Sequence, residues 1–228
     1  TSGLIYSFFY CGIYVLSLLG GLIADRTQNY KGTITAGLIT MAAGYVLLSI
    51  PILSTPDNIA WLLTLTCVAL FLIAFGNGLF KGNLQAIVGQ MYDNPQYEKQ
   101  RDSGFQIFYV FINIGGVIAP FVAPLLREWW LKAHDMIYNA QLPALCHQFQ
   151  ESGNATEQLT KLASESGFVA ESGDIATFCG DYLQVFNEGI HYSFIASVAA
   201  MLISLTIFIA TRKRFPTPAK KAAAVSVD

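Results

Sequence analysis

Lys81 is the most unusual residue of this sequence, by its type and by its position. It follows an apolar run that begins near Trp61, and between Asp57 and Asp93 it is the only charged side chain. A run of about 20 apolar residues is long enough to cross the hydrocarbon core of a bilayer. An amine costs at least about 2.5–3.5 kcal/mol there, so it normally faces the protein interior or a water-filled cavity. The position therefore indicates a site for a negatively charged ligand or side chain.

A second interpretation of Lys81 stays open. Lysines near the end of a membrane helix often extend their amine to the lipid–water interface and have no further role. Gly76, Gly78 and Gly82 lie close to Lys81 in the sequence. Such glycines permit close helix packing or local unwinding, which is typical of a ligand site within a helix bundle. The rest of the chain has to decide between the two interpretations.

The composition indicates a membrane protein. Of the 228 residues, 54% are hydrophobic and 12% are charged, whereas soluble domains carry about 25% charged residues. We therefore expect an all-α integral membrane protein. The apolar segments predict five spanning helices, over about 4–24, 33–53, 59–92, 104–126 and 192–211.

The distribution of basic residues predicts how these segments cross the membrane. Basic residues follow the first, third and fifth segments, near 26–31, 99–101 and 212–221, and the region 127–188 is mainly acidic. Because short cytoplasmic loops are enriched in Lys and Arg, the three basic ends are predicted to be cytoplasmic and 127–188 to be outside. The start of the chain is then outside as well, from which we expect a further helix upstream.

The region 127–188 is predicted to form a small cap of short helices, because its apolar residues recur at helical spacing. Cys146 and Cys179 lie in this region, and oxidising compartments favour disulfides. In the chain-entropy model, closing a loop of this size stabilises the fold by about 4 kcal/mol. Two reduced thiols packed in the cap are the alternative.

The sequence has no pattern of an enzyme or of a metal site. His134, His147 and His191 are scattered without metal-ligand spacing. Phosphate-binding loops, nucleophile elbows and metal-binding helices are absent, so a membrane-embedded hydrolase has no supporting residues. We expect no enzymatic activity, metal, cofactor or nucleic-acid partner.

Two sets of motifs resemble a known family. Gly21, Asp25, Arg26 and Lys31 are similar to the signature between the second and third helices of major facilitator superfamily transporters. The resemblance implies that these positions form a conformational latch on the cytoplasmic side, and solvated loop charges are the alternative for Asp25 and Arg26. We expect Asp25 to pair with a basic or helix-terminal partner only when the cytoplasmic side is closed. Further blocks resemble, in their order and spacing, the proton-dependent oligopeptide transporter (POT) family, and they lie at 76–83, 89–92, 101–105 and 108–115.

The resemblance implies a major facilitator superfamily fold, of which this chain supplies helices two to six of the N-terminal six-helix bundle. Helices two to five then lie within 1–126, and 127–188 is an extracytoplasmic insertion, longer than the loop typical of bacterial members. Residues 189–211 form helix six, and 212–228 form a basic cytoplasmic linker. A first helix and a C-terminal six-helix half would complete a multi-pass protein, which we expect in a bacterial inner membrane.

The resemblance also implies roles for individual side chains. Lys81 would bind the carboxylate of a peptide or a proton-coupling carboxylate on the first helix. Tyr109 and Asn113 are four residues apart and share one helix face, from which a hydroxyl and an amide can bind a peptide backbone. Tyr14 resembles a cavity tyrosine of the family. Ordinary aromatic packing of Tyr14 and an interhelical hydrogen bond of Asn113 are the alternatives.

Three functions follow from these interpretations. The first is proton-coupled symport of di- and tripeptides by alternating access, with small peptides, protons and the lipid bilayer as partners. The second is transport of another small anion, such as nitrate, on the same fold. The third is a membrane receptor or scaffold whose cap binds a partner without transport. An upstream helix with a Glu-x-x-Glu-Arg motif would favour the first.

The predicted orientation can be tested by thiol labelling. Cysteines are introduced singly at Glu165 and Thr217, and an impermeant reagent is added to intact cells. Position 165 should be labelled and position 217 protected, because the charge bias places them on opposite sides of the membrane. The parent protein without the added cysteine is the control. Protection at 165 with labelling at 217 would invert the topology.

Overall fold

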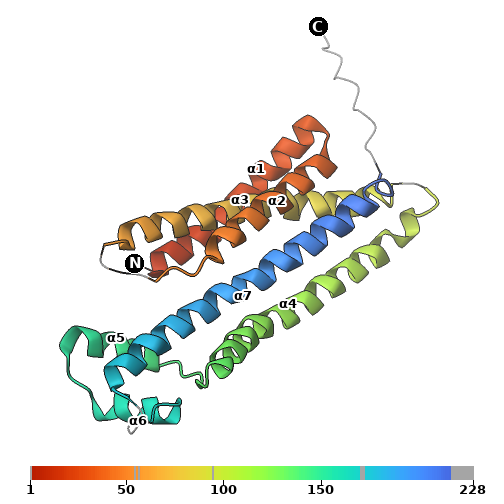
Figure 1. The fold of residues 1–228 in the computed structure, drawn as a ribbon. Helices are drawn as coiled ribbons and strands as arrows, with labels where there is room; N and C mark the ends of the chain where they lie inside the picture. Colours follow the sequence, from red (N-terminus) through yellow and green to blue (C-terminus); the bar gives the residue numbers. More distant parts are fainter. Residues whose placement is uncertain (1, 54, 56, 94, 170–172, 217–228) are drawn as a thin grey trace. The chain divides into compact units, whose positions relative to one another are not determined.

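The computed structural model describes residues 2–53, 55, 57–93, 95–169 and 173–216 (Figure 1). Position 217 of the labelling experiment and most of the predicted linker 212–228 lie outside these residues. Described residues fall into helices and connections, and none of them forms a β-strand. The all-α class predicted from the sequence is therefore confirmed.

Five long helices correspond to the five predicted spans, and each is long and apolar enough to cross a membrane. Two short helices and one turn of 3₁₀-helix, Glu98–Gln100, lie between them. The long helices are α1 (Ser2–Thr27), α2 (Tyr30–Leu48), α3 (Ile59–Gln90), α4 (Arg101–Ala133) and α7 (Ile175–Thr211), and the short ones are α5 (Leu142–Ser152) and α6 (Glu157–Glu165).

Helices α4 and α7 extend further than the sequence predicted. We expected spans over 104–126 and 192–211, but α4 continues to Ala133 and α7 already begins at Ile175. The extensions carry polar and charged residues among the apolar ones, so hydropathy alone could not separate them from independent cap helices. The expected boundary between 188 and 189 therefore falls inside one continuous helix.

The chain divides into two compact units. Unit 1 consists of Thr1–Leu47, Trp61–Gly116 and Ser197–Asp228, and unit 2 consists of Leu48–Ala60 and Val117–Ala196. Unit 2 thus contains the whole of the predicted insertion together with the adjoining parts of α4 and α7.

Unit 1 depends on glycine contacts between α3 and its two neighbours, α1 and α2. A Cβ atom on Gly20 would lie 2.2 Å from the carbonyl oxygen of Gly78, and one on Gly76 would lie 2.6 Å from the carbonyl oxygen of Gly37. No side chain fits at such distances, so the helix backbones touch directly. Small residues at helix interfaces permit this approach in membranes. The glycines near Lys81 therefore fix α3 against both neighbours.

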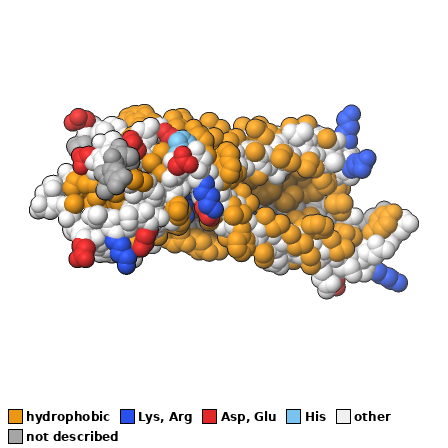
Figure 2. All heavy atoms as spheres, turned by 60° about the horizontal axis from the view of Figure 1, so that its bottom comes forward, with side chains coloured by type: hydrophobic (Ala, Val, Ile, Leu, Met, Phe, Trp, Pro, Cys, Tyr) orange, Lys and Arg blue, Asp and Glu red, His pale blue; other side chains and the backbone are white. Residues whose placement is uncertain are grey.

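Side chains bury only a small apolar core in unit 1, formed by Ile34, Leu38, Met41, Ile87 and Phe208. Many large hydrophobic side chains on the long helices remain exposed. Figure 2 shows hydrophobic side chains, in orange, over most of the helical surface in view. Exposed apolar faces of this extent are typical of helices that contact lipid or further helices.

Unit 2 has a larger core of nine buried residues, contributed by α4, α5, α6 and α7. Arg127 of α4 stacks on aromatic rings beside this core, with its Cζ 4.2 Å from the ring centroid of Tyr138 and 5.4 Å from that of Phe186. The buried residues are Leu131, Leu142, Cys146, Leu159, Ala163, Cys179, Tyr182, Leu183 and Val185.

The glycine contact predicts the effect of adding one methyl group. Gly20→Ala should lower the melting temperature of the full-length protein, because its Cβ would overlap the backbone of α3 and overpacking typically costs about 1–3 kcal/mol. Gly21→Ala is the matched control, because a Cβ there meets nothing within 4 Å. Equal melting temperatures for the two variants would show that the contact is dispensable.

Candidate functional site

Lys81 lies on α3 beside Tyr14 of α1. Its Nζ atom is 5.8 Å from the centroid of the Tyr14 ring, which is a cation–π distance. Both side chains are exposed in this chain, and none of the ion pairs found among the described residues includes Lys81. Among the described residues the ammonium group thus lies over an aromatic ring and takes part in no ion pair, so its hydrogen-bond donors can bind an anionic ligand.

Tyr14 is the last of three tyrosines on one face of α1. The ring centroids of Tyr6 and Tyr10 are 5.9 Å apart, and those of Tyr10 and Tyr14 are 5.5 Å apart. The Tyr14 hydroxyl donates to the Tyr10 hydroxyl over 3.5 Å. Only Tyr14 was predicted as a site residue, although the regular spacing of four residues could have identified Tyr6 and Tyr10 as well. The three rings extend the site along α1.

Gln85 connects the site to α4. It follows Lys81 by four residues, so the two side chains share one face of α3. The Gln85 Nε2 atom donates to the hydroxyl of Tyr109 on α4 over 3.4 Å. Asn113 is exposed and lies one turn further along α4, on the face that carries Tyr109. Within unit 1, Tyr14 of α1 thus lies beside Lys81 of α3, and Tyr109 of α4 contacts Gln85 on the same face of α3. Gln85 is a site residue that the sequence analysis missed.

Asn83 holds the helix that carries Lys81. Its side chain is 1% exposed, and its Nδ2 atom donates to the carbonyl oxygen of Gly20 over 3.1 Å and to that of Leu79 over 2.8 Å. Buried polar groups in a membrane need internal partners. One of the two acceptors of this amide, the carbonyl oxygen of Gly20, lies on another helix. The bond joins α1 to α3 two residues from Lys81.

The predicted latch residues lie at the turn between α1 and α2. Asp25 accepts a hydrogen bond from the Tyr30 hydroxyl over 2.5 Å. Lys31 Nζ donates to the carbonyl oxygen of Phe215, just after α7, over 2.6 Å. Arg26 is exposed. We expected a basic or helix-terminal partner for Asp25, and the partner in this structure is the first residue of α2, where the helix dipole also favours a negative charge.

Cys146 of α5 and Cys179 of α7 meet in the core of unit 2. Both are free thiols and 0% exposed, and a hydrogen bond joins their side chains. Burial raises the pKa of the Cys146 thiol, and the hydrogen bond to Cys179 raises it further. The structure thus places side by side, as thiols, the two cysteines for which the sequence predicts a disulfide.

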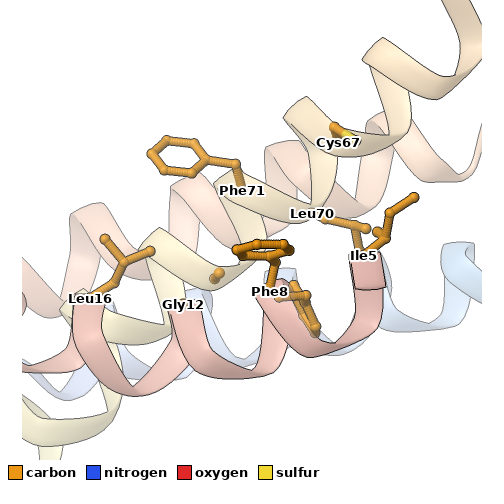
Figure 3. A pocket seen from close by; sticks show the side chains of 9 residues that line it. Ile5, Phe8, Gly12, Leu16, Cys67, Leu70 and Phe71 are labelled. Atoms are coloured by element: carbon orange, nitrogen blue, oxygen red, sulfur yellow. The ribbon is translucent and has the colours of Figure 1, made fainter. Parts of the chain in front are cut away.

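An apolar pocket of about 280 Å³ lies on another face of α1 in unit 1 (Figure 3). It contains none of the predicted site residues, and its lining offers no charged side chain for an anion. We therefore do not assign the ligand site to it. Its lining includes Phe8, Gly12 and Leu16 of α1 and Cys67, Leu70 and Phe71 of α3.

Known proteins resemble this chain over much of its length. Residues 31–226 match the POT family. An uncharacterized transporter of Bacillus subtilis is 34% identical over 116 residues, which are 51% of this chain and 21% of that protein. A di-/tripeptide transporter of Lactococcus lactis subsp. cremoris is 38% identical over 110 residues, 48% of this chain and 20% of its own length.

A third relative is a dipeptide and tripeptide permease B of Shigella dysenteriae serotype 1. It is 34% identical over 127 residues, which are 56% of this chain and 24% of the permease. The chain thus spans only about a fifth to a quarter of the length of these relatives. No solved structure matches the chain.

Proposed function

This chain belongs to the POT family, and we propose that the complete protein is a proton-coupled symporter of di- and tripeptides. The five long apolar helices and the bacterial relatives identify a multi-pass bacterial membrane protein with an all-α fold of the major facilitator type. The names of the di-/tripeptide relatives support peptides as the substrate class. The observation that carries the proposal is the Lys81 ammonium group, which is exposed over Tyr14 and forms no ion pair within the part of the chain that the structure describes.

In this proposal, Lys81 binds the C-terminal carboxylate of the peptide. A hydrogen bond between two charged groups is roughly twice as strong as one between neutral groups, so this contact fixes one end of the substrate. The tyrosines of α1 would line the same end, because Tyr14 lies under the ammonium group.

The neutral groups of α3 and α4 would bind the peptide backbone. The Tyr109 hydroxyl, which accepts a hydrogen bond from Gln85, keeps its own proton as a donor, and the Asn113 amide offers both donors and acceptors. These groups extend the site beyond Lys81, which supports a ligand longer than a small inorganic anion. We therefore favour a peptide over nitrate.

Proton coupling would use the charge of Lys81 as well. A cation near a carboxylate favours its ionised form and lowers its pKa. Where a coupling carboxylate of the complete protein and the peptide carboxylate alternate as partners of Lys81, the carboxylate that Lys81 releases becomes easier to protonate, because its pKa rises. Loading of the substrate and movement of the proton would then be linked through one side chain.

The Lys81 proposal predicts the loss of coupled transport. In the full-length protein, Lys81→Ala should abolish proton-driven uptake of a labelled dipeptide into proteoliposomes, because it removes the cation that both carboxylates need. The melting temperature should change little, because Lys81 is exposed and forms no ion pair within the described residues. Counterflow without a proton gradient should persist if the lysine serves coupling alone.

Two further variants sharpen the Lys81 test. Lys81→Arg should restore uptake only in part, because a planar guanidinium does not replace a compact amine. Lys99→Ala, which removes an exposed lysine outside the long helices, is the matched control and should transport normally. Wild-type uptake by Lys81→Ala would mean that the lysine only reaches toward the membrane interface.

The contact between Asp25 and Tyr30 generates a second prediction. If this bond forms in only one of the two access states, its loss should shift their balance by roughly 1–3 kcal/mol, or about 5- to 150-fold. Asp25→Asn should therefore slow turnover while peptide affinity is retained, as measured by uptake and equilibrium binding. Asp57→Asn, in an exposed turn, is the control. An unchanged transport rate in Asp25→Asn would assign Asp25 to the solvated surface.

A further inference from the structure

We propose that Cys146 and Cys179 form a disulfide that fastens α5 to the first turns of α7 in unit 2. The inference concerns a covalent modification and does not depend on which substrate the protein carries. It rests on the predicted exterior position of 127–188, where thiols meet an oxidising environment.

The two thiols are neighbours in one buried core. Each is 0% exposed and part of the same core, and a hydrogen bond joins the side chains. They come from different helices, α5 and α7, so the contact is made by the tertiary structure and is not a consequence of sequence proximity. A disulfide has an S–S length of about 2.05 Å, so the two neighbouring sulfurs have to approach each other further for the bond to form.

Tyr182, one turn after Cys179 on α7, already holds the neighbouring segment of unit 2. Its hydroxyl accepts a hydrogen bond from the backbone N–H of Asn139 over 2.9 Å and donates one to the carbonyl oxygen of Ile137 over 3.1 Å. The segment before α5 is thus fixed to α7 by Tyr182. A bond from Cys146 to Cys179 would fix α5 itself to the same face of α7.

The bond must form while unit 2 folds, because neither thiol is accessible afterwards. The oxidant is an external disulfide, such as a protein disulfide of the extracytoplasmic space. The thiolate of one cysteine attacks it, which gives a mixed disulfide and releases one thiol. The thiolate of the second cysteine then displaces the other thiol. Two cysteine thiols are oxidised to one disulfide, and the external disulfide is reduced to two thiols that take up the two protons.

The burial of the pair also determines how the bond has to be measured. A buried thiol with a raised pKa carries little reactive thiolate, so a reagent added to the folded protein would miss reduced cysteines as well as oxidised ones. Alkylation is therefore done on the full-length protein after acid quenching and in denaturant, without reductant. Cys11 and Cys67, which are exposed free thiols, serve as internal controls that should be alkylated.

Digestion with trypsin separates the possible outcomes. Lys161 lies between the two cysteines, so they fall in different tryptic peptides. We expect one cross-linked pair of peptides in the mass spectrum, which splits into two alkylatable peptides after reduction. Alkylation of both positions without reductant would overturn the proposal, and so would a link from either cysteine to a different one.

Variants test whether the bond stabilises unit 2. Cys67→Ser should leave the cross-linked pair intact, whereas Cys146→Ser should abolish it and leave Cys179 alkylated. Cys146→Ser should also be cleaved several-fold faster than Cys67→Ser in limited proteolysis at the exposed turn 153–156, and equal rates would contradict the stabilising role. If Cys146→Ser does not fold, the wild-type digest still decides. The digest detects the bond whether or not the protein transports peptides. A missing cross-link would therefore contradict the disulfide without contradicting the proposed transport function.

Discussion

The direct backbone contact of α3 with α1 and α2 is the constraint on which the rest of unit 1 depends. Within a bilayer the hydrophobic effect does not draw helices together, so association relies on packing and on hydrogen bonds between helices. Gly20 and Gly37 lie so close to the backbone of α3 that a methyl group would not fit at either position. Asn83 adds a buried hydrogen bond to Gly20 at the same contact. Lys81 lies between Gly78 and Asn83, the two residues of α3 that contact Gly20. Its position beside Tyr14 therefore follows from the packing.

Unit 2 follows a different physical principle. Its core is built from large side chains, among them Leu131, Leu142 and Tyr182, as in a small water-soluble domain, where burial of apolar area supplies most of the driving force. Arg127 contributes through its flat guanidinium, which stacks on Tyr138 and Phe186. A small domain has limited apolar area to bury, so a covalent link between α5 and α7 would add to the stability that the core supplies.

The proposed site combines one cation with neutral hydrogen-bonding groups, and this combination suits a substrate class that is defined by its backbone. Lys81 would recognise a carboxylate that every peptide carries. Tyr109 and Asn113 would bind amide groups that every peptide also carries. None of these contacts requires a particular peptide side chain, so the arrangement would accept many di- and tripeptides while discriminating against ligands without a carboxylate.

The sequence by itself determined the number and type of the spanning helices, the unusual position of Lys81 and the family, because hydropathy and motif spacing are local properties of the chain. The pairing of Tyr109 with Gln85, the bond from Asn83 to Gly20 and the contact of Cys146 with Cys179 appeared only in the tertiary structure. These contacts depend on where helices cross and how they are rotated, and residues far apart in the chain set both. The start of α7 at Ile175 was missed for a related reason, because burial against α5 and α6, and not hydropathy, keeps its first turns helical.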